Sequence, residues 1–488
     1  MAGPRKRGTP SRSSMNRNNI WVHVSLAVVL VTIAAVIGQI DRWRSALKAP
    51  LVQRVSVTNV KPNPIKTKGS NSEPEVLVRF KPGTTLDMIR ALAMRNHDQV
   101  VDDIESVNGL VAIDDLDDAD PQMVANQYAA MPNVSYAEPN AVIQLDDPTA
   151  GNTSVDNDSN TYEADLPNDP QFADQWALHN QGQEGGKERA DIDALKAWAK
   201  TQGSNNVVVA VLDTGVDYNH VDLRANIWTR PDNVPEYVDE ELGAVDDIHG
   251  FDVDMDLGDP MDDNGHGTHC AGVIGAEADN GEGIAGINWH VRIMPLKFLG
   301  RGGNGTTKAA IEAINYAIDR KKHGVNVRVI SASWGSTQRS KALEDVIRAA
   351  GDAGILFVAA AGNNGTDNDK RPHYPSNYDL PNVISVAALD RNDQMASFSN
   401  YGIKTVQIAA PGKDIRSTWL GDQYREASGT SMATPHVAGV AALVIAAYPN
   451  ITVEKLRERL LKSVDKIDSL SGKIASGGRL NAAKAVGN

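Results

Sequence analysis

Apolar and polar positions divide the chain into an apolar run near the N-terminus, a small mixed segment and a long alternating segment. Within the mixed segment, residues 75–145, strand-like and helix-like spacings alternate. The strand-like runs are 76–80, 110–113 and 134–145, and the helix-like runs are 84–95 and 121–131. This β-α-β-α-β order predicts a small α+β domain.

Residues 167–488 alternate short apolar, β-rich runs with helical segments. The strand runs are 207–212, 293–298, 327–332, 355–360 and 383–388, and helical periodicity is clear at 308–321 and 341–353. Strands that alternate with helices favour a parallel sheet covered by helices on both faces. We therefore expect a three-layer α/β/α fold with a mostly parallel sheet.

The N-terminal apolar run, residues 20–40, follows a basic segment that contains no acidic residue. Its length fits a single membrane anchor, and its most apolar stretch, 26–37, fits the core of a secretory signal. A buried core helix would leave the basic flank unexplained. We assign residues 1–44 to a signal peptide or membrane anchor, which places the remainder outside the cytoplasm, secreted or anchored. Polar composition marks residues 45–74 and 146–166 as linkers.

The composition narrows the classes of function. The 488 residues are 41% hydrophobic and 23% charged, which is ordinary for a globular protein. A net charge of −14 gives no general electrostatic reason to bind phosphate backbones, so we expect no nucleic-acid partner. The single cysteine, Cys270, excludes an intramolecular disulfide and a zinc cluster built on several cysteines. An exported protein of this kind needs another stabiliser.

Two polar motifs stand at the ends of predicted elements. Asp213 ends the apolar run 207–212, at the edge where open α/β sheets place their sites, although a lone aspartate there is also an ordinary turn residue. His266 and His269 lie in a glycine-bracketed helix start. Their spacing allows a metal pair, but no zincin-type glutamate lies between them.

A third motif precedes a long apolar helix. Pro435 fits the first turn of that helix, and Ser431 stands just ahead of it, near the positive end of the helix dipole. Taken alone, Ser431 could equally be a helix N-cap. A hydroxyl nucleophile, however, needs a base, and the base needs an orienting carboxylate. The chain supplies all three in the order Asp, His, Ser.

The motifs Val-Leu-Asp213-Thr-Gly, His266-Gly-Thr-His-Cys-Ala-Gly and Gly-Thr-Ser431-Met-Ala-Thr-Pro-His resemble those of the subtilisin-like serine proteases, the subtilases. The resemblance covers residues 167–488. It implies that Ser431 is the nucleophile, His266 the general base and acid, and Asp213 the residue that orients His266. It also implies that Asn363 and the Ser431 N–H bind the oxyanion, and that His269 and His436 are structural.

The resemblance further implies that a polypeptide substrate binds as an extended strand to a monomeric enzyme. The expected substrate-binding residues are Gly300, Gly302, Ser333, Trp334, Gly335, Gly362 and His373. Trp334 is bulkier than the usual Leu and should reshape the subsite that it lines. His373 stands where many members have Gly at the base of the first specificity pocket, which argues against a deep aromatic pocket.

Calcium is the cofactor that the resemblance implies, as a structural ion. The residues that match the strong calcium loop of the family are Asp169, Asp222, Glu277, Asn280, Glu282 and Ile284. Oxygen ligands of this kind suit a hard cation, whereas a bare surface loop is the alternative. A second acidic loop offers Asp252, Asp256, Asp259 and Asp263, and a solvated acidic face explains it equally well.

Residues 75–145 resemble the inhibitory propeptide of these proteases through Val-Leu-Val-Arg-Phe80 and Val134-Ser-Tyr-Ala-Glu-Pro-Asn140. The resemblance implies a ferredoxin-like prodomain that assists folding, blocks the site and is cut off between Leu145 and Asp169. Cys270 is then a buried core residue rather than a nucleophile.

The sequence thus predicts an exported serine endopeptidase that is made as a zymogen. One rival is a catalytically silent subtilisin fold that only binds. Another is a nucleotide-binding α/β domain, which the absence of Gly-x-Gly-x-x-Gly after the first strand disfavours.

Overall fold

A computed structural model describes residues 74–145, 149–150, 166–239, 243–255 and 258–487. The expected signal or anchor, nearly all of the 45–74 linker and most of the 146–166 linker lie outside the described residues. Among the described residues, one helix, α8 (Thr430–Ala447), is long and apolar enough to cross a membrane, and 89% of it is buried inside the protein. It is therefore a core helix.

Residues 76–139 form a four-stranded antiparallel sheet with two helices, in the order β-α-β-β-α-β. The elements are β1 (Val76–Phe80), α2 (Leu86–Arg95), β2 (Asp98–Asp103), β3 (Leu110–Asp115), α3 (Pro121–Ala129) and β4 (Val134–Pro139). A side chain caps the N-terminus of each helix: Thr85 caps α2, and Asp120 caps α3, which has Pro121 in its first turn. In the sheet the strands lie in the order β2-β3-β1-β4.

The sequence missed β2, and it merged β4 with the separate strand β5 (Val142–Gln144). Strand β2 reads Asp-Gln-Val-Val-Asp-Asp, which carries no strong apolar signal. Two of its aspartates are nevertheless buried, because partners from elsewhere reach them: Tyr128 donates to Asp98 at 2.5 Å, and Lys308 lies 3.4 Å from Asp102. Such partners are non-local, so the hydrophobic pattern could not reveal this strand.

The rest of the chain is built on a nine-stranded sheet with the strand order β10-β11-β7-β13-β14-β15-β16-β20-β19. All neighbouring pairs are parallel except β19 and β20. The strands are β7 (Gly203–Asp213), β10 (Phe251–Asp252), β11 (His290–Lys297), β13 (Val327–Ala332), β14 (Leu356–Ala360), β15 (Val383–Leu389), β16 (Ile408–Pro411), β19 (Val464–Lys466) and β20 (Gly478–Leu480).

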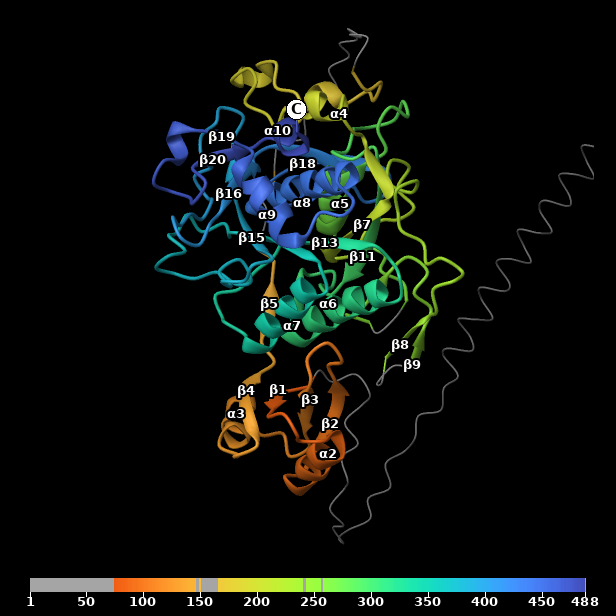
Figure 1. Ribbon diagram of the computed structural model, residues 1–488, viewed down its shortest axis with the longest axis vertical. Coiled ribbons are helices and arrows are strands. Elements are labelled where there is room, and N and C mark those ends of the chain that lie inside the picture. The colour runs from red at the N-terminus through yellow and green to blue at the C-terminus, as the bar shows by residue number, and fades with distance from the viewer. Residues whose placement is uncertain (1–73, 146–148, 151–165, 240–242, 256–257, 488) are drawn as a thin grey trace, which may run out of the picture. The chain divides into compact units, whose positions relative to one another are not determined.

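Helices cover both faces of this sheet, so the predicted three-layer α/β/α architecture is confirmed (Figure 1). One face packs against α5 (His266–Gly275) and α8, and the other against α6 (Thr307–Lys322) and α7 (Lys341–Asp352). The remaining helices of this part are α4 (Ala194–Trp198), α9 (Val453–Lys462), α10 (Ala482–Val486) and the 3-10 turns Phe172–Asp174, Gln183–Gly185 and Asp468–Leu470. The central strands read as unbroken apolar runs because both of their faces are buried.

Small ladders surround the large sheet. They comprise β5 with β12 (Asn304–Thr306), β6 (Thr149–Ala150) with β18 (Gln423–Ser428) and β17 (Ile415–Trp419), and β8 (Tyr237–Asp239) with β9 (Gly243–Val245).

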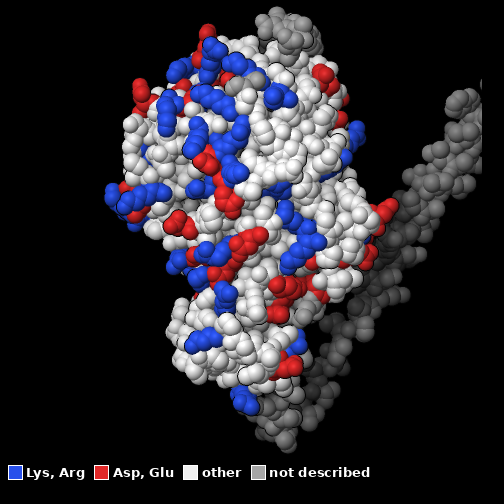
Figure 2. Space-filling model, in the orientation of Figure 1, with Lys and Arg blue, Asp and Glu red and all other residues white. Residues whose placement is uncertain are grey.

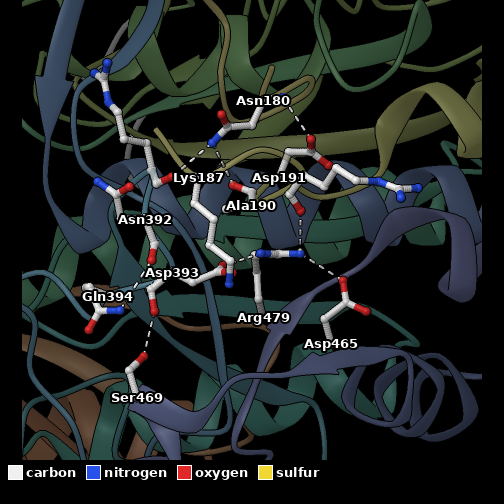
Figure 3. A network of polar contacts seen from close by, with 12 residues as sticks. Asn180, Lys187, Ala190, Asp191, Asn392, Asp393, Gln394, Asp465, Ser469 and Arg479 are labelled. Carbon is white, nitrogen blue, oxygen red and sulfur yellow. Dashed lines mark hydrogen bonds and ion pairs between the residues drawn. The ribbon is translucent and has the colours of Figure 1, made fainter. Parts of the chain in front are cut away.

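A buried ion-pair network ties the C-terminal strand β20 to the loops around residues 180–193 and 390–394 (Figure 3). Arg479, which is 5% exposed, pairs with Asp393 and donates to Asp465 at 3.0 Å and to the carbonyl of Arg189 at 3.1 Å. Lys187 lies 3.0 Å from the same Asp393. Removing one partner would leave a buried charge uncompensated, so this network fixes the loops at the end of the sheet.

On the surface, acidic and basic side chains are interspersed over the face shown in Figure 2.

Candidate active site

Strand β7 and helix α5 bring Asp213 and His266 together. Asp213 is fully buried at the carboxyl end of β7, and its Oδ1 lies 2.7 Å from Nδ1 of His266. The close packing requires glycine: a Cβ on Gly267 would lie 2.1 Å from the carbonyl oxygen of Gly215. Because Nδ1 bonds to a carboxylate, it carries the proton, and Nε2 is left as a base.

The pKa of the His266 imidazole reflects two opposing effects. Burial lowers it, but the charge of Asp213 and the hydrogen bond between them outweigh burial and raise the pKa above its ordinary value. Burial also lowers the pKa of His269 to about 3 and that of His436 to about 4, so both are neutral. Nε2 of His269 contacts the carbonyl of Ile415, whereas Nδ1 of His266 contacts Asp213, so the two α5 histidines have different partners.

Asp262, which the sequence analysis missed, holds the start of α5 against β7. It accepts hydrogen bonds from the hydroxyls of Thr214 (2.9 Å) and Thr268 (2.6 Å). It also accepts the backbone N–H groups of Asn264, Gly265 and Thr268. An aspartate shortly before a helix start was the available signal, because such residues bind the free N–H groups of the first turn.

Ser431 lies in the first turn of α8, which begins at Thr430 rather than at Pro435 as the sequence suggested. Asn363, on the loop after β14, turns its Oδ1 toward Thr430, whose N–H and hydroxyl donate to it at 2.8 and 2.9 Å. Its Nδ2 must therefore point the other way. A Cβ on Gly429 would lie 3.2 Å from that Nδ2, which places the amide beside the start of α8.

Four buried polar atoms at this site have no hydrogen-bond partner within the described part of the chain: Nε2 of His266, Oγ of Ser431, Nδ2 of Asn363 and Oδ2 of Asp213. Buried polar groups are normally paired, so such orphans in one place are expected where a reactant binds. Cys270 does not compete as a nucleophile. Burial raises the pKa of its thiol well above the usual value, and its Sγ donates to the carbonyl of Ser431.

An extended segment of the chain lies in the neighbouring cleft. Strand β5 pairs antiparallel with β12, Gln144 bridges to Gly335, and the N–H of Leu145 donates to the carbonyl of Gly303 at 2.8 Å. The pairing edge is thus Gly303–Thr306. The expected Gly300 lies instead in the preceding turn, where its N–H donates to Asn304, and Gly302 lies within the same turn.

Three of the other expected substrate-binding residues, Ser333, Trp334 and His373, make contacts inside the protein. The hydroxyl of Ser333 donates to the carbonyl of Ser431 at 2.8 Å. Trp334 is 1% exposed, donates from its indole to the Leu212 carbonyl and packs on Phe298, so it is anchored in the core. His373 lies between Gly335 and Gly362, with its ring close to both.

The residues expected to bind calcium surround one loop. Asp169 and Asp222 are buried, and both face the loop 277–284, where they accept N–H groups of Asp279 and Ile284. Burial raises the pKa of Asp169 to about 6, and burial together with the nearby Asp169 charge raises that of Asp222 to about 7. Two buried carboxylates that repel each other fit a hard divalent cation.

The loop itself supplies the remaining expected ligands. The side chain of Asn280 donates to Asp222 at 2.9 Å, the N–H of Glu277 donates to the Asp222 carbonyl, and the N–H of Glu282 donates to Asn280. Asn280 therefore lies directly beside one of the two buried carboxylates.

The second acidic loop does not gather its side chains in the same way. Asp252 accepts the N–H of Asp254, Asp259 accepts the hydroxyl of Tyr218, and Asp263 pairs with Lys297. Asp256 lies outside the described residues. The three described aspartates thus have separate partners.

Comparison with known proteins identifies the family. Residues 204–485 match the model of Peptidase_S8, the subtilase family. The chain belongs to the subtilase family. This subtilase is 35% identical over 427 residues to the thermophilic serine proteinase of Bacillus sp. (strain AK1), covering 86% of this chain and 88% of that protein. It is 38% identical over 320 residues to thermitase of Thermoactinomyces vulgaris, covering 66% of this chain and 99% of thermitase.

Among solved structures, the subtilase resembles a protease from Pseudoalteromonas arctica PAMC 21717. The TM-score is 0.53 at 30% identity, covering 66% of this chain and 98% of that one. Membership of this family of serine proteases implies polypeptide substrates.

Proposed function

We propose that this subtilase is a serine endopeptidase with an Asp213–His266–Ser431 triad, made as a zymogen that cuts its own chain. The observation that carries the proposal is the buried 2.7 Å contact between Asp213 and His266. It leaves Nε2 of His266, like Oγ of Ser431, without a partner among the described residues.

The reaction follows from the roles of these atoms. Oγ of Ser431 attacks the peptide carbonyl while its proton passes to Nε2 of His266, and Asp213 stabilises the imidazolium that forms. Nδ2 of Asn363 and the N–H of Ser431 donate to the oxygen that becomes negative. His266 then gives the proton to the departing amine, and a water molecule repeats the sequence to release the acyl group from Ser431.

Two sets of contacts support a zymogen. Strand β5 pairs with β12 along the edge that we assign to the substrate, and β6, a few residues later, pairs with Ala427 and Ser428 just before Ser431. Residues 75–145 also bind the starts of two helices of the catalytic domain. Glu138 accepts the N–H groups of Lys341 and Ala342, and Asn140 accepts that of Lys308. A carboxylate at a helix N-terminus is favoured electrostatically, so Glu138 helps to hold residues 75–145 on the catalytic domain. A domain held there supports the proposed inhibition.

Calcium is proposed as a structural ion held by Asp169, Asp222, Asn280 and the loop 277–284. When bound, it supplies the positive charge that two buried carboxylates lack. These ligands connect the segment around Asp169 to helix α5, because the loop 277–284 follows that helix. Without disulfides, such a link is the available way to stabilise an exported chain.

Export, either by secretion or with a membrane anchor, is proposed from the basic and apolar N-terminal sequence. One relative of this chain is named a cell wall-associated protease of Bacillus subtilis (strain 168). It is 36% identical over 304 residues, covering 62% of this chain and 31% of that protein. Both observations support the proposal that the catalytic domain lies outside the cytoplasm, where we propose that it acts as a monomer.

Hydrolysis of casein tests the endopeptidase proposal. Wild type and Ser471→Ala, which changes an exposed serine, should digest casein equally when calcium is present. Ser431→Ala should lose about 10⁶-fold in turnover, the scale known for removal of a subtilisin nucleophile. If wild type and Ser431→Ala show the same digestion or none, the chain is a binding protein on a subtilase fold.

A further inference from the structure

The ring of His373 fills the space between two chain segments beside Ser431. A Cβ on Gly335 would lie 2.0 Å from Cε1 of this ring, and a Cβ on Gly362 would lie 3.0 Å from its Cδ2. The side chain is 2% exposed. Both walls are glycine because the imidazole already occupies the volume that their side chains would need.

This space adjoins the nucleophile on both sides. Ser333, two residues before Gly335, donates its hydroxyl to the carbonyl of Ser431 at 2.8 Å. The N–H of Gly362 donates to the hydroxyl of Thr430, the residue before Ser431. A substrate side chain that reaches the His373 ring therefore comes from the residue whose carbonyl Ser431 attacks.

The register of the strand in the cleft identifies that residue. Gln144 lies opposite Gly335 in an antiparallel bridge. Paired antiparallel strands run in opposite directions. A substrate bound in the register of Gln144 against Gly335 therefore places the residue two positions further along its chain opposite Ser333, beside Ser431. Two positions after Gln144 in the sequence stands an aspartate, Asp146, followed by Asp147.

The groups around His373 suit a short substrate side chain that accepts a hydrogen bond. The imidazole occupies the depth that an aromatic side chain would use. A ring N–H can donate to a carboxylate, and a buried carboxylate requires such a donor. The polar residues in described contact with the His373 backbone, Ser376 and Asn377, are neutral, as is Asn400 beside Gly362. None of these three repels a negative charge.

We propose that His373 makes the first specificity pocket select a short acidic side chain, and that the zymogen cuts itself after Asp146. This inference rests on the proposed endopeptidase function. It assigns a preference for Asp or Glu before the cut bond, where a deep apolar pocket would take Phe or Leu.

A peptide series tests the preference on the mature enzyme. Each fluorogenic peptide carries Val-Ile-Gln-Leu-X-Asp-Pro-Thr, with X as Asp, Glu, Asn, Ala, Leu, Phe or Lys, and kcat/KM is measured for cleavage after X. Wild type should cut after Asp or Glu about tenfold or more faster than after Phe or Leu. The N-terminus of the mature chain should be Asp147.

Two variants separate the size of the ring from its N–H. His373→Gly opens the pocket, so cleavage after Phe should rise about tenfold and cleavage after Asp should fall. His373→Leu keeps most of the volume without a donor, so it should lose the acidic preference while still cutting poorly after Phe. Because each variant is compared with itself across X, a moderate loss of stability does not obscure the ratio.

The results discriminate between the two proposals. If no peptide is cut by wild type, the endopeptidase proposal fails and the specificity fails with it. If peptides are cut in a Ser431-dependent way but Phe or Leu equals or exceeds Asp, only the inference about His373 is overturned. The same holds if neither variant changes the Asp-to-Phe ratio, or if the mature N-terminus is not Asp147.

Discussion

The carbonyl oxygen of Ser431 accepts the hydroxyl of Ser333 at 2.8 Å, although it lies inside helix α8. In a regular helix this carbonyl would accept the N–H four residues later, but that residue is Pro435, which has none. The proline thus frees the backbone of Ser431 for a bond to the segment that borders the cleft. This bond fixes Ser431, the proposed nucleophile, to the segment 333–335.

Ser333→Ala tests that coupling. It leaves the Ser431 carbonyl with the weak Cys270 thiol as donor, so kcat should fall about fivefold, the value of one ordinary hydrogen bond, with KM less affected. Kinetics on a peptide substrate measure this. Ser471→Ala, on the exposed surface, should change neither constant. A Ser333→Ala enzyme with unchanged kcat would show that the bond does not position Ser431.

The pH profile should report on the contact between Asp213 and His266. Protonated His266 cannot accept the serine proton, and the Asp213 charge raises the pKa of His266 above its usual 6.5. Activity should therefore be lost as pH falls through a value above 6.5, measured as kcat/KM against pH.

Asp213→Asn should move this acidic limb to lower pH and reduce kcat about 10⁴-fold, the loss known for the equivalent change in a Ser-His-Asp triad. An acidic limb that does not move in Asp213→Asn would contradict the assigned pairing.

Binding of the cut propeptide should weaken as pH rises. Glu312 on α6 and Asp102 on β2 are both buried where the two domains meet, with Lys308 lying 3.4 Å from Asp102. Burial, and then the charge of Asp102, raise the pKa of Glu312 well above its usual 4.5. The complex therefore holds a proton that an exposed glutamate would release. Its affinity should fall by up to about tenfold per pH unit above that usual value.

Gel filtration of the self-cut complex, with Ser431 blocked by a sulfonyl fluoride, measures the propeptide retained at about pH 5 and about pH 9. Glu312→Gln needs no proton at this position and should show a smaller difference between the two pH values. Equal pH dependence in wild type and Glu312→Gln would rule out this carboxyl as the cause.

Removing calcium should lower the thermal stability of the mature enzyme. A ligand at a hundred times its Kd stabilises by about 2.7 kcal/mol, which corresponds to roughly 4 °C in Tm for a catalytic domain of this size. Calorimetry with and without a chelator measures this shift. Asp222→Asn should largely lose the response, whereas Asp232→Asn, at an exposed site, should keep it. A chelator that leaves the wild-type Tm unchanged would remove the case for calcium.

The sequence predicted the core of the fold because the central strands are buried on both faces. The run 327–332 coincides with β13, and the helical segment 341–353 differs from α7 by one residue. Where burial depends on distant partners, prediction failed. Strand β2 is aspartate-rich and needs Tyr128 and Lys308, and Asp262 needs the hydroxyls of Thr214 and Thr268.

The candidate site shows the same contrast between residues marked by local sequence and residues whose role depends on distant partners. Motifs pointed to Asp213, His266, Ser431 and Asn363, because these residues stand in short segments with characteristic neighbours, and their catalytic roles stay predictions. The cleft edge was misplaced by a few residues, at Gly300 and Gly302 rather than Gly303–Thr306, because glycines recur through that loop. Only the register of β5 against β12 shows which of them bind a strand. Likewise, the burial of Trp334 depends on Phe298 and the Leu212 carbonyl, which its local sequence does not reveal.

The most direct test of the central claim is the intact mass of the full chain, purified with calcium as wild type and as Ser431→Ala. The account predicts that wild type is cut after Asp146 while Ser431→Ala keeps the linkage between residues 75–145 and the catalytic domain. If Ser431→Ala is cut as wild type is, or if both stay whole and neither digests casein, Ser431 does not cut its own chain and the zymogen account is wrong.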